Sequence, residues 1–161
     1  MSQVEDLQHL SPSVMVDIVS QGLRIQLMDN DRNPLFKNGS EYLNANGRKL
    51  LAMVSEVVEL LTNKIAITGH TASAELIETH SQTNWELSIR RANSARRALK
   101  ANGIPDQRVT SVDGKADTLL LDKDQPNSAR NRRIAVLILK EVRNPTQKEL
   151  APDRLFKLPK L

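Results

Sequence analysis

Alternation of apolar and polar residues near the start of the chain predicts two β-strands. In residues 23–28 the apolar side chains alternate strictly with Arg24 and Gln26, so one face of the strand would be buried and the other exposed. A Ser-Gln-Gly turn separates this segment from a preceding apolar run over residues 14–19. The two segments are therefore expected to form a hairpin.

Two later segments carry the 3.6-residue period of an amphipathic helix. Within residues 45–62, apolar side chains recur from Leu50 onward at i+4, i+7, i+8 and i+11. A second helix is predicted to open at Thr83, because Glu86 three residues later completes a capping-box pattern. It is expected to run to about Asn102, where the next residue is a glycine suited to a left-handed helix terminus.

Short apolar runs over residues 64–68, 108–112 and 134–139 predict three further strands. The last of these is apolar on both faces, which is typical of a strand at the centre of a sheet. The order of elements predicts an α/β (α+β) two-layer sandwich, with a mixed sheet and both helices packed on one face. Residues 1–13 are interpreted as a linker, 14–140 as one domain and 141–161 as a tail.

The overall composition excludes some classes of function but does not identify the function. The chain has no cysteine, which excludes a disulfide framework and a thiol nucleophile, and its 2% aromatic content leaves few platforms for stacking bases or sugars. A net charge of +4 suits an anionic partner such as nucleic acid, a membrane surface or cell-wall glycan. No apolar run approaches the roughly 18–20 residues of a membrane span, and the polar start is not a signal peptide. Taken literally, the chain would be cytoplasmic; taken as a fragment, it could come from any compartment.

Three motifs, in order along the chain, carry a family resemblance. They are Ile-Ala-Ile-Thr-Gly-His-Thr at residues 65–71, Asn-Trp-Glu-Leu-Ser-Ile-Arg-Arg-Ala at 84–92, and Asn-Arg-Arg-Ile-Ala-Val at 131–136. Together they resemble the "GHTD", "NxxLSxxRA" and "NRR" motifs of the OmpA-like peptidoglycan-binding domains. The resemblance covers about residues 14–140. It implies the OmpA-like fold, a periplasmic location and non-catalytic binding of peptidoglycan, with no cofactor.

Within that family the chain most resembles the MotB family of flagellar stator proteins. Three features carry this resemblance: Trp85 within Asn-Trp-Glu-Leu-Ser, the segment Gly-Leu-Arg-Ile-Gln-Leu at residues 22–27, and Pro-Leu-Phe at 34–36 followed by Gly-Ser at 39–40. This resemblance implies a homodimer that anchors a motor stator to the cell wall. It also implies a MotA-like channel partner, engaged through an N-terminal inner-membrane helix that is absent here, so that the chain would be an excised periplasmic fragment.

The same resemblance implies a binding site and one departure from it. The family pairs an acid after Gly-His-Thr with an arginine, which suits the ammonium and carboxylate groups of diaminopimelate. The arginine is Arg91, but Ala72 stands where the acid is expected. Either Glu75 or Glu78 substitutes from the following loop, or the contact is lost and binding weakens about tenfold to hundredfold. The expected peptidoglycan-binding residues are Thr71, Ala72, Asn84, Leu87, Arg91, Asn131 and Arg132.

Several neighbouring residues have structural interpretations instead. Trp85 is expected to be a packing anchor rather than a sugar platform, His70 to bond the backbone at its turn, and Arg133 to be structural. Thr71 is balanced between stabilising the turn and touching the ligand. Five cations are expected to form one basic helix face, either solvated or attracting anionic glycan: Arg90, Arg91, Arg96, Arg97 and Lys100.

Three other classes of function are weighed against wall binding. An enzyme is disfavoured because the chain has no G-x-S-x-G, H-E-x-x-H or P-loop motif, and its histidines lack metal-site spacing. A nucleic-acid-binding module is suggested by the arginine-rich helix, but few aromatics and the family motifs disfavour it, so no nucleic-acid partner is expected. An OmpA-like anchor of another envelope system, such as a lipoprotein, porin or secretion apparatus, stays open.

Overall fold

The computed structural model describes residues 11–75 and 82–141. The greater part of the predicted linker and tail, and Glu78, lie outside the described residues. The regular elements are β1 (Val14–Val19), β2 (Gly22–Met28), α2 (Ala45–Leu60), β3 (Ile65–His70), α3 (Asn84–Ala101), β4 (Val109–Gly114) and β5 (Arg133–Leu139), with short 3-10 helices at Asp106–Arg108 and Ala129–Asn131. Each predicted strand and helix is present within a few residues of its expected bounds.

The five strands form one mixed sheet in the order β1-β2-β5-β3-β4. Only the β3–β4 pairing is parallel among the strand pairs of the described residues. The central position predicted for the last strand is confirmed, because Val136 of β5 pairs with Ile25 of β2 on one side and Ile67 of β3 on the other. All three side chains are fully buried, so the centre of the sheet is also the centre of the core.

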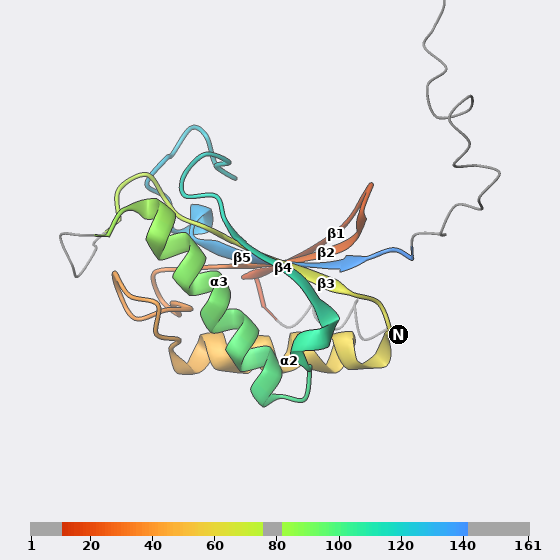
Figure 1. Ribbon diagram of the computed structural model, residues 1–161. Helices are drawn as coiled ribbons and strands as arrows, with labels where there is room; N and C mark the ends of the chain where they lie inside the picture. The colour runs from red at the N-terminus through yellow and green to blue at the C-terminus, as the bar shows by residue number, and fades with distance from the viewer. Residues whose placement is uncertain (1–10, 76–81, 142–161) are drawn as a thin grey trace, which may run out of the picture.

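Both helices pack on one face of the sheet, which confirms the two-layer sandwich (Figure 1). Helix α3 lies close to β3 because the residues between them are small: Ser88, Ala92 and Ala95 are fully buried. A Cβ atom at Gly69 of β3 would lie 2.1 Å from the carbonyl oxygen of Ser88. The glycine is therefore required by the close approach of the helix.

The predicted ends of α3 are confirmed. The carboxylate of Glu86 accepts hydrogen bonds from the backbone N–H and the hydroxyl of Thr83, which is the N-cap residue. At the other end, Gly103 has φ of +99°, the left-handed conformation that terminates many helices. Because a helix turns about 100° per residue, fixing these ends brings Leu87 and Arg91 to the same buried side.

Two predictions about the surface of α3 are wrong. Trp85 lies two residues before the buried Leu87, on the opposite side of the helix, and is 51% exposed rather than a packing anchor. The five cations do not form one basic face, because Arg91 is buried and Arg96 and Lys100 are paired with a carboxylate, that of Asp106, at 2.7 and 2.8 Å. No helix in the described part of the chain is long and apolar enough to cross a membrane.

Candidate functional site

Arg91 lies at the centre of the candidate site. Its Nε donates a hydrogen bond to the carbonyl oxygen of Ser40 at 2.8 Å, and its guanidinium carbon lies 4.9 Å from the ring centroid of Phe36. Its Nη1 atom is buried and has no hydrogen-bond partner among the described residues. The side chain is thus held in place by one end, while donors at the other end are unused.

Glu75 brings a carboxylate to Arg91 from the loop after β3. Its Oε2 lies 3.8 Å from Arg91 Nη1, and its Oε1 accepts a hydrogen bond from the backbone N–H of Ala72 at 2.8 Å. The two side chains are only 4% and 2% exposed. Burial raises the pKa of Glu75, although the nearby charge of Arg91 acts in the opposite direction. An acid is therefore present beside the position where Ala72 replaces the family aspartate.

A second charged pair lies close by, between Arg132 and Asp29. The Nε of Arg132 donates to Asp29 Oδ2 at 2.8 Å, and the other oxygen of Asp29 accepts from the backbone N–H of Leu35 at 2.7 Å. Arg132 also lies 3.4 Å from the exposed carboxylate of Asp31. Burial lowers the pKa of Arg132, but the hydrogen bond and charge of Asp29 outweigh it and raise that pKa overall.

A cavity of about 220 Å³ lies between the two arginines. Its lining comes mainly from the polar loop after β2 together with the two arginines: Asp29, Asn30, Asp31, Pro34, Phe36, Asn38, Arg91 and Arg132. Because both carboxylates and guanidinium groups line it, it suits a ligand that carries an ammonium and a carboxylate. Sequence reasoning had not assigned Asp29, Phe36 or Ser40 to the site, although the run of Asp and Asn at residues 29–33 was a signal of a polar loop.

Two of the other expected site residues lie beside the Glu75 loop. Thr71 is fully buried and its hydroxyl oxygen has no partner among the described residues. The side-chain amide of Asn84 donates to the carbonyl oxygen of Ser73 at 3.1 Å, so it ties the start of α3 to that loop. Leu87 is buried as well. Among these residues, Ala72 is linked to the Arg91 site through its backbone N–H, which donates to Glu75, and Asn84 through its bond to Ser73.

Asn131 has a different position from the one that a ligand contact would need. It is fully buried, and its Oδ1 accepts from the backbone N–H of Asp122 at 2.8 Å. Its amide nitrogen donates to the carbonyl oxygens of Asp122, Gln125 and Pro126. The side chain thus organises the loop before β5 and is not among the residues that line the Arg91 cavity.

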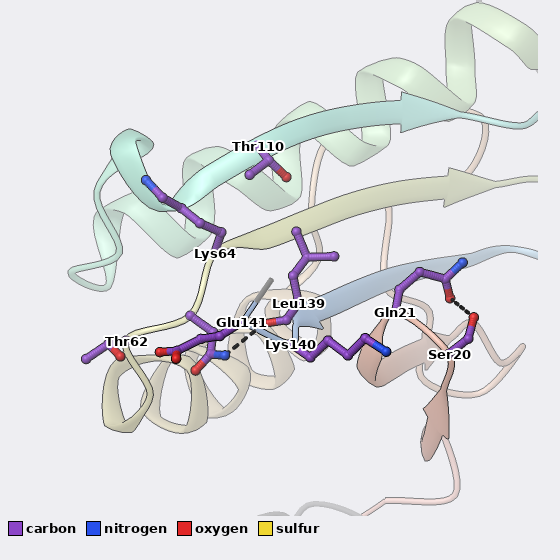
Figure 2. Close-up of a pocket in the computed structure, with 9 residues that line it drawn as sticks. Ser20, Gln21, Thr62, Lys64, Thr110, Leu139, Lys140 and Glu141 are labelled. Carbon is purple, nitrogen blue, oxygen red and sulfur yellow. Dashed lines mark hydrogen bonds between the residues drawn. The ribbon is translucent and has the colours of Figure 1, made fainter. Parts of the chain in front are cut away.

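A separate cavity of about 500 Å³ lies at the opposite end of the sheet (Figure 2). It is bordered by the start of β3 and the end of β5, where the amide of Asn63 donates to the carbonyl oxygen of Leu139 at 2.8 Å. Lys64, Lys140 and Glu141 are its charged lining residues. This cavity lacks the paired arginines and carboxylates of the first, so the candidate site remains at Arg91.

The described residues contain no candidate metal site. No group of three His, Cys, Asp or Glu residues within residues 11–75 and 82–141 could hold a metal ion. The charged groups around Arg91 form the ion pairs Arg91–Glu75 and Arg132–Asp29.

Comparisons of the sequence relate the chain to known proteins. The model of the OmpA family matches residues 35–133. The chain is 40% identical over 131 residues to an Escherichia coli K12 protein whose name describes it as a truncated flagellar export/assembly protein, LafU, covering 81% of this chain and 62% of that protein. It is 38% identical over 138 residues to Motility protein B of the same strain, covering 83% of this chain and 44% of that protein. The chain thus spans less than two thirds of the length of these relatives.

Solved structures show the same fold. The periplasmic domain of Helicobacter pylori MotB superposes with a TM-score of 0.77 and 17% identity, covering 93% of each chain. The cell wall anchor of the T6SS from Pseudomonas aeruginosa superposes with a TM-score of 0.69 and 21% identity, covering 85% of this chain and 93% of that one. At such identities the likeness concerns the fold alone. The family match over residues 35–133 and the relatives named above together establish that the chain belongs to the OmpA family, with similarity to Motility protein B.

Proposed function

We propose that this chain binds peptidoglycan through the site at Arg91, as a non-catalytic anchor. Peptidoglycan binding is the general role of the OmpA family, and Arg91 occupies the arginine position of the family motif. The observation that carries the proposal is the buried guanidinium of Arg91, whose Nη1 has no hydrogen-bond partner in the described part of the chain. A carboxylate of a stem peptide would accept from this group in a charge-assisted hydrogen bond.

In this proposal Glu75 replaces the acid missing at position 72. The N–H of Ala72 holds one of its oxygens while the other faces Arg91, so the carboxylate lies next to the backbone that the family aspartate would occupy. The ligand ammonium is then received by Glu75 and by Asp29, which borders the cavity. Thr71, Asn84, Leu87 and Arg132 support this arrangement, while Asn131 acts through the loop that it holds.

The similarity to Motility protein B supports a finer assignment. In it, the domain formed by residues 14–140 holds a flagellar stator to the cell wall in the periplasm. It acts as a homodimer, and a MotA-like channel protein is the partner of the whole assembly, joined to it through an inner-membrane helix. Residues 1–13 would serve as linker and 141–161 as tail. Anchoring of another envelope system is the alternative, and stator assembly in cells distinguishes the two.

The test is co-sedimentation of the chain with insoluble peptidoglycan sacculi. The wild type is expected to pellet, and Arg91→Lys to bind at least tenfold more weakly, because lysine keeps the charge but loses the planar donor geometry. Glu75→Gln is expected to weaken binding by loss of the ammonium contact. Arg97→Ala is the matched control, since it removes a charge from the exposed side of the same helix.

Folding of each variant is checked by circular dichroism before binding is compared, because Arg91 and Glu75 are buried. If folded Arg91→Lys and Glu75→Gln both pellet like the wild type, the site assignment fails. If the folded wild type itself stays in solution, peptidoglycan binding by this chain is excluded while the family membership stands.

A further inference from the structure

The face of the sheet that the helices leave open carries its own cavity. The segment from Lys115 to Lys123 folds over the ends of β2, β3 and β5 and encloses about 520 Å³ against them. Because α2 and α3 pack on the other face, the sheet lies between this cavity and the buried side of α3 that carries Arg91 (Figure 1). The cavity is therefore distinct from the proposed peptidoglycan site.

Positive charge dominates the lining of this open-face cavity. Arg24, Lys115, Lys123 and Arg133 line it, and no aspartate or glutamate does so among the described residues. Arg24 is compensated, because its Nε donates to the carboxylate of Asp17 at 2.9 Å. Within the described ranges no carboxylate oxygen lies within 4.0 Å of the other three. Three cations thus face one concave surface without a paired acid.

Arg133 is the most unusual of the three because it is only 7% exposed. Its N–H groups donate to neutral acceptors: Gln26 Oε1 at 2.9 Å, the carbonyl oxygen of Asn131 at 3.2 Å and that of Leu119 at 2.8 Å. The other two buried or partly buried arginines near the end of this sheet, Arg91 and Arg132, each have a carboxylate partner. A buried guanidinium without one favours capture of an anion.

His70 lies in the lining of this positively charged cavity. It stands opposite Arg133 in the β3–β5 register and lines the same surface. Burial, followed by the charges of Arg133, Lys115 and Arg24, lowers the pKa of His70 to about 3. Its Nδ1 has no partner in the described part of the chain, contrary to the expected bond to the turn backbone. Burial first, and the neighbouring cations second, thus keep the imidazole neutral at physiological pH.

We propose that this open-face cavity binds a phosphate group, held by Lys115, Lys123 and Arg133. A carboxylate would neutralise only one of the three cations, whereas a phosphate monoester carries about −1.5 to −2 at pH 7. Leu119, Leu121 and Leu137 contribute apolar surface beside the cations. The phosphate is therefore either free or the terminal phosphate monoester of a lipid such as phosphatidic acid, whose carbon atoms contact the leucines.

The test is titration of the 161-residue chain with inorganic pyrophosphate at constant ionic strength, followed by NMR at the His70 imidazole. Saturable shifts are expected with pyrophosphate and not with chloride, because a bound polyanion offsets the charges around His70. The double variant Lys115→Gln/Lys123→Gln is expected to bind at least tenfold more weakly. Both lysines are exposed, so the fold is retained. The control Lys49→Gln/Lys100→Gln removes the same charge from the helix layer and is expected to bind like the wild type.

Vesicles distinguish the two sources of phosphate. Co-sedimentation with vesicles containing phosphatidic acid but not with pure phosphatidylcholine, lost in the Lys115→Gln/Lys123→Gln variant, assigns a lipid phosphate. Binding of pyrophosphate without vesicle binding assigns a soluble phosphate. If neither probe binds the wild type, or if both double variants bind equally well, the proposal is overturned. Sedimentation with sacculi is a separate readout, so this result leaves the peptidoglycan assignment untouched.

Discussion

The Nη1 atom of Arg91 and the Oε2 atom of Glu75 lie 3.8 Å apart beneath the loop that follows β3. At this distance the charges attract, but the geometry is too long for a hydrogen bond. Arg91 thus has its charge compensated while its Nη1 has no hydrogen-bond partner among the described residues. In the proposed site a ligand carboxylate would accept a hydrogen bond from this Nη1 while Glu75 receives the ligand ammonium, so both groups contribute to the affinity.

The first prediction is that Glu75→Gln stabilises the chain increasingly as pH rises. Burial raises the pKa of Glu75 above its ordinary value of 4.5. Between 4.5 and the raised value the folded state binds more protons than the unfolded state, so the contribution of Glu75 to stability falls as pH rises through this window. Glutamine keeps an acceptor for the N–H of Ala72 without this loss. Urea midpoints at pH 4 and pH 7 are expected to favour the variant more at pH 7.

An equal difference between the two midpoints at both pH values would contradict this account of Glu75. Glu56→Gln is the control, because it makes the same substitution at an exposed carboxylate on α2. Together with the weaker sedimentation expected for Glu75→Gln, a gain in stability would show that Glu75 serves binding while it lowers the free energy of unfolding.

The second prediction concerns acid sensitivity at His70. Its pKa is lowered from 6.5 to about 3 by burial and by nearby cations, so the unfolded chain binds a proton that the folded chain does not. Its contribution is therefore complete above pH 6.5 and is lost as pH falls towards 3, with a slope of about 1.4 kcal/mol per pH unit. His70→Gln is expected to show a shallower loss of unfolding free energy between pH 6.5 and 5. Identical slopes in the two proteins would refute the assignment.

The third prediction is that Gly69→Ala destabilises the chain more than Gly103→Ala. A Cβ atom at Gly69 would meet the Ser88 carbonyl oxygen at 2.1 Å, so α3 would have to move off the sheet, at about 1–3 kcal/mol or more. Gly103 has nothing within 4 Å of its added Cβ, and only its positive φ is unfavourable, at about 1–2 kcal/mol. Denaturant unfolding of both variants measures the difference, and the reverse order would show that the helix is not tightly seated there.

The fourth prediction is that Asn131→Ala loosens the loop before β5. The side chain accepts from the Asp122 N–H and donates to three carbonyl oxygens of the loop, so its loss leaves partly buried backbone groups unpaired, at about 1 kcal/mol. Faster hydrogen exchange at the Asp122 amide is expected. Asn38→Ala, in an exposed loop, is the control. Unchanged exchange at Asp122 would argue against an organising role for Asn131.

Local sequence patterns predicted the elements of this fold well because their causes are local. The alternation at residues 23–28 gave β2, and the Thr83–Glu86 pair gave the start of α3. The two apolar faces of the last strand predicted its central place, because only a strand between two others buries both. These features depend on neighbours in sequence, or on burial that a single strand already reveals.

The site was predicted less well because it depends on contacts between distant segments. The sequence predicted Arg91 as part of a basic helix face. Its burial could not be foreseen, because it depends on the loop carrying Ser40 and Phe36, which lies far away in sequence. Glu75 was one of two possible substitutes, and its position beside Arg91 depends on the N–H of Ala72, while Glu78 lies outside the described residues. Such backbone donors leave no trace in residue identity.

The position of β5 has a consequence for how the chain is made. This strand is the last regular element described, yet it pairs with β2 and β3, which are synthesised much earlier. While the ribosome is still translating residues 71–132, the facing edges of β2 and β3 have no native strand to bond, and exposed edges invite pairing with other chains. The nascent polypeptide can complete its sheet only once Leu139 has left the exit tunnel. The sheet is therefore completed only after all the other described elements have been synthesised, and a ribosome stalled within that interval would display an aggregation-prone intermediate.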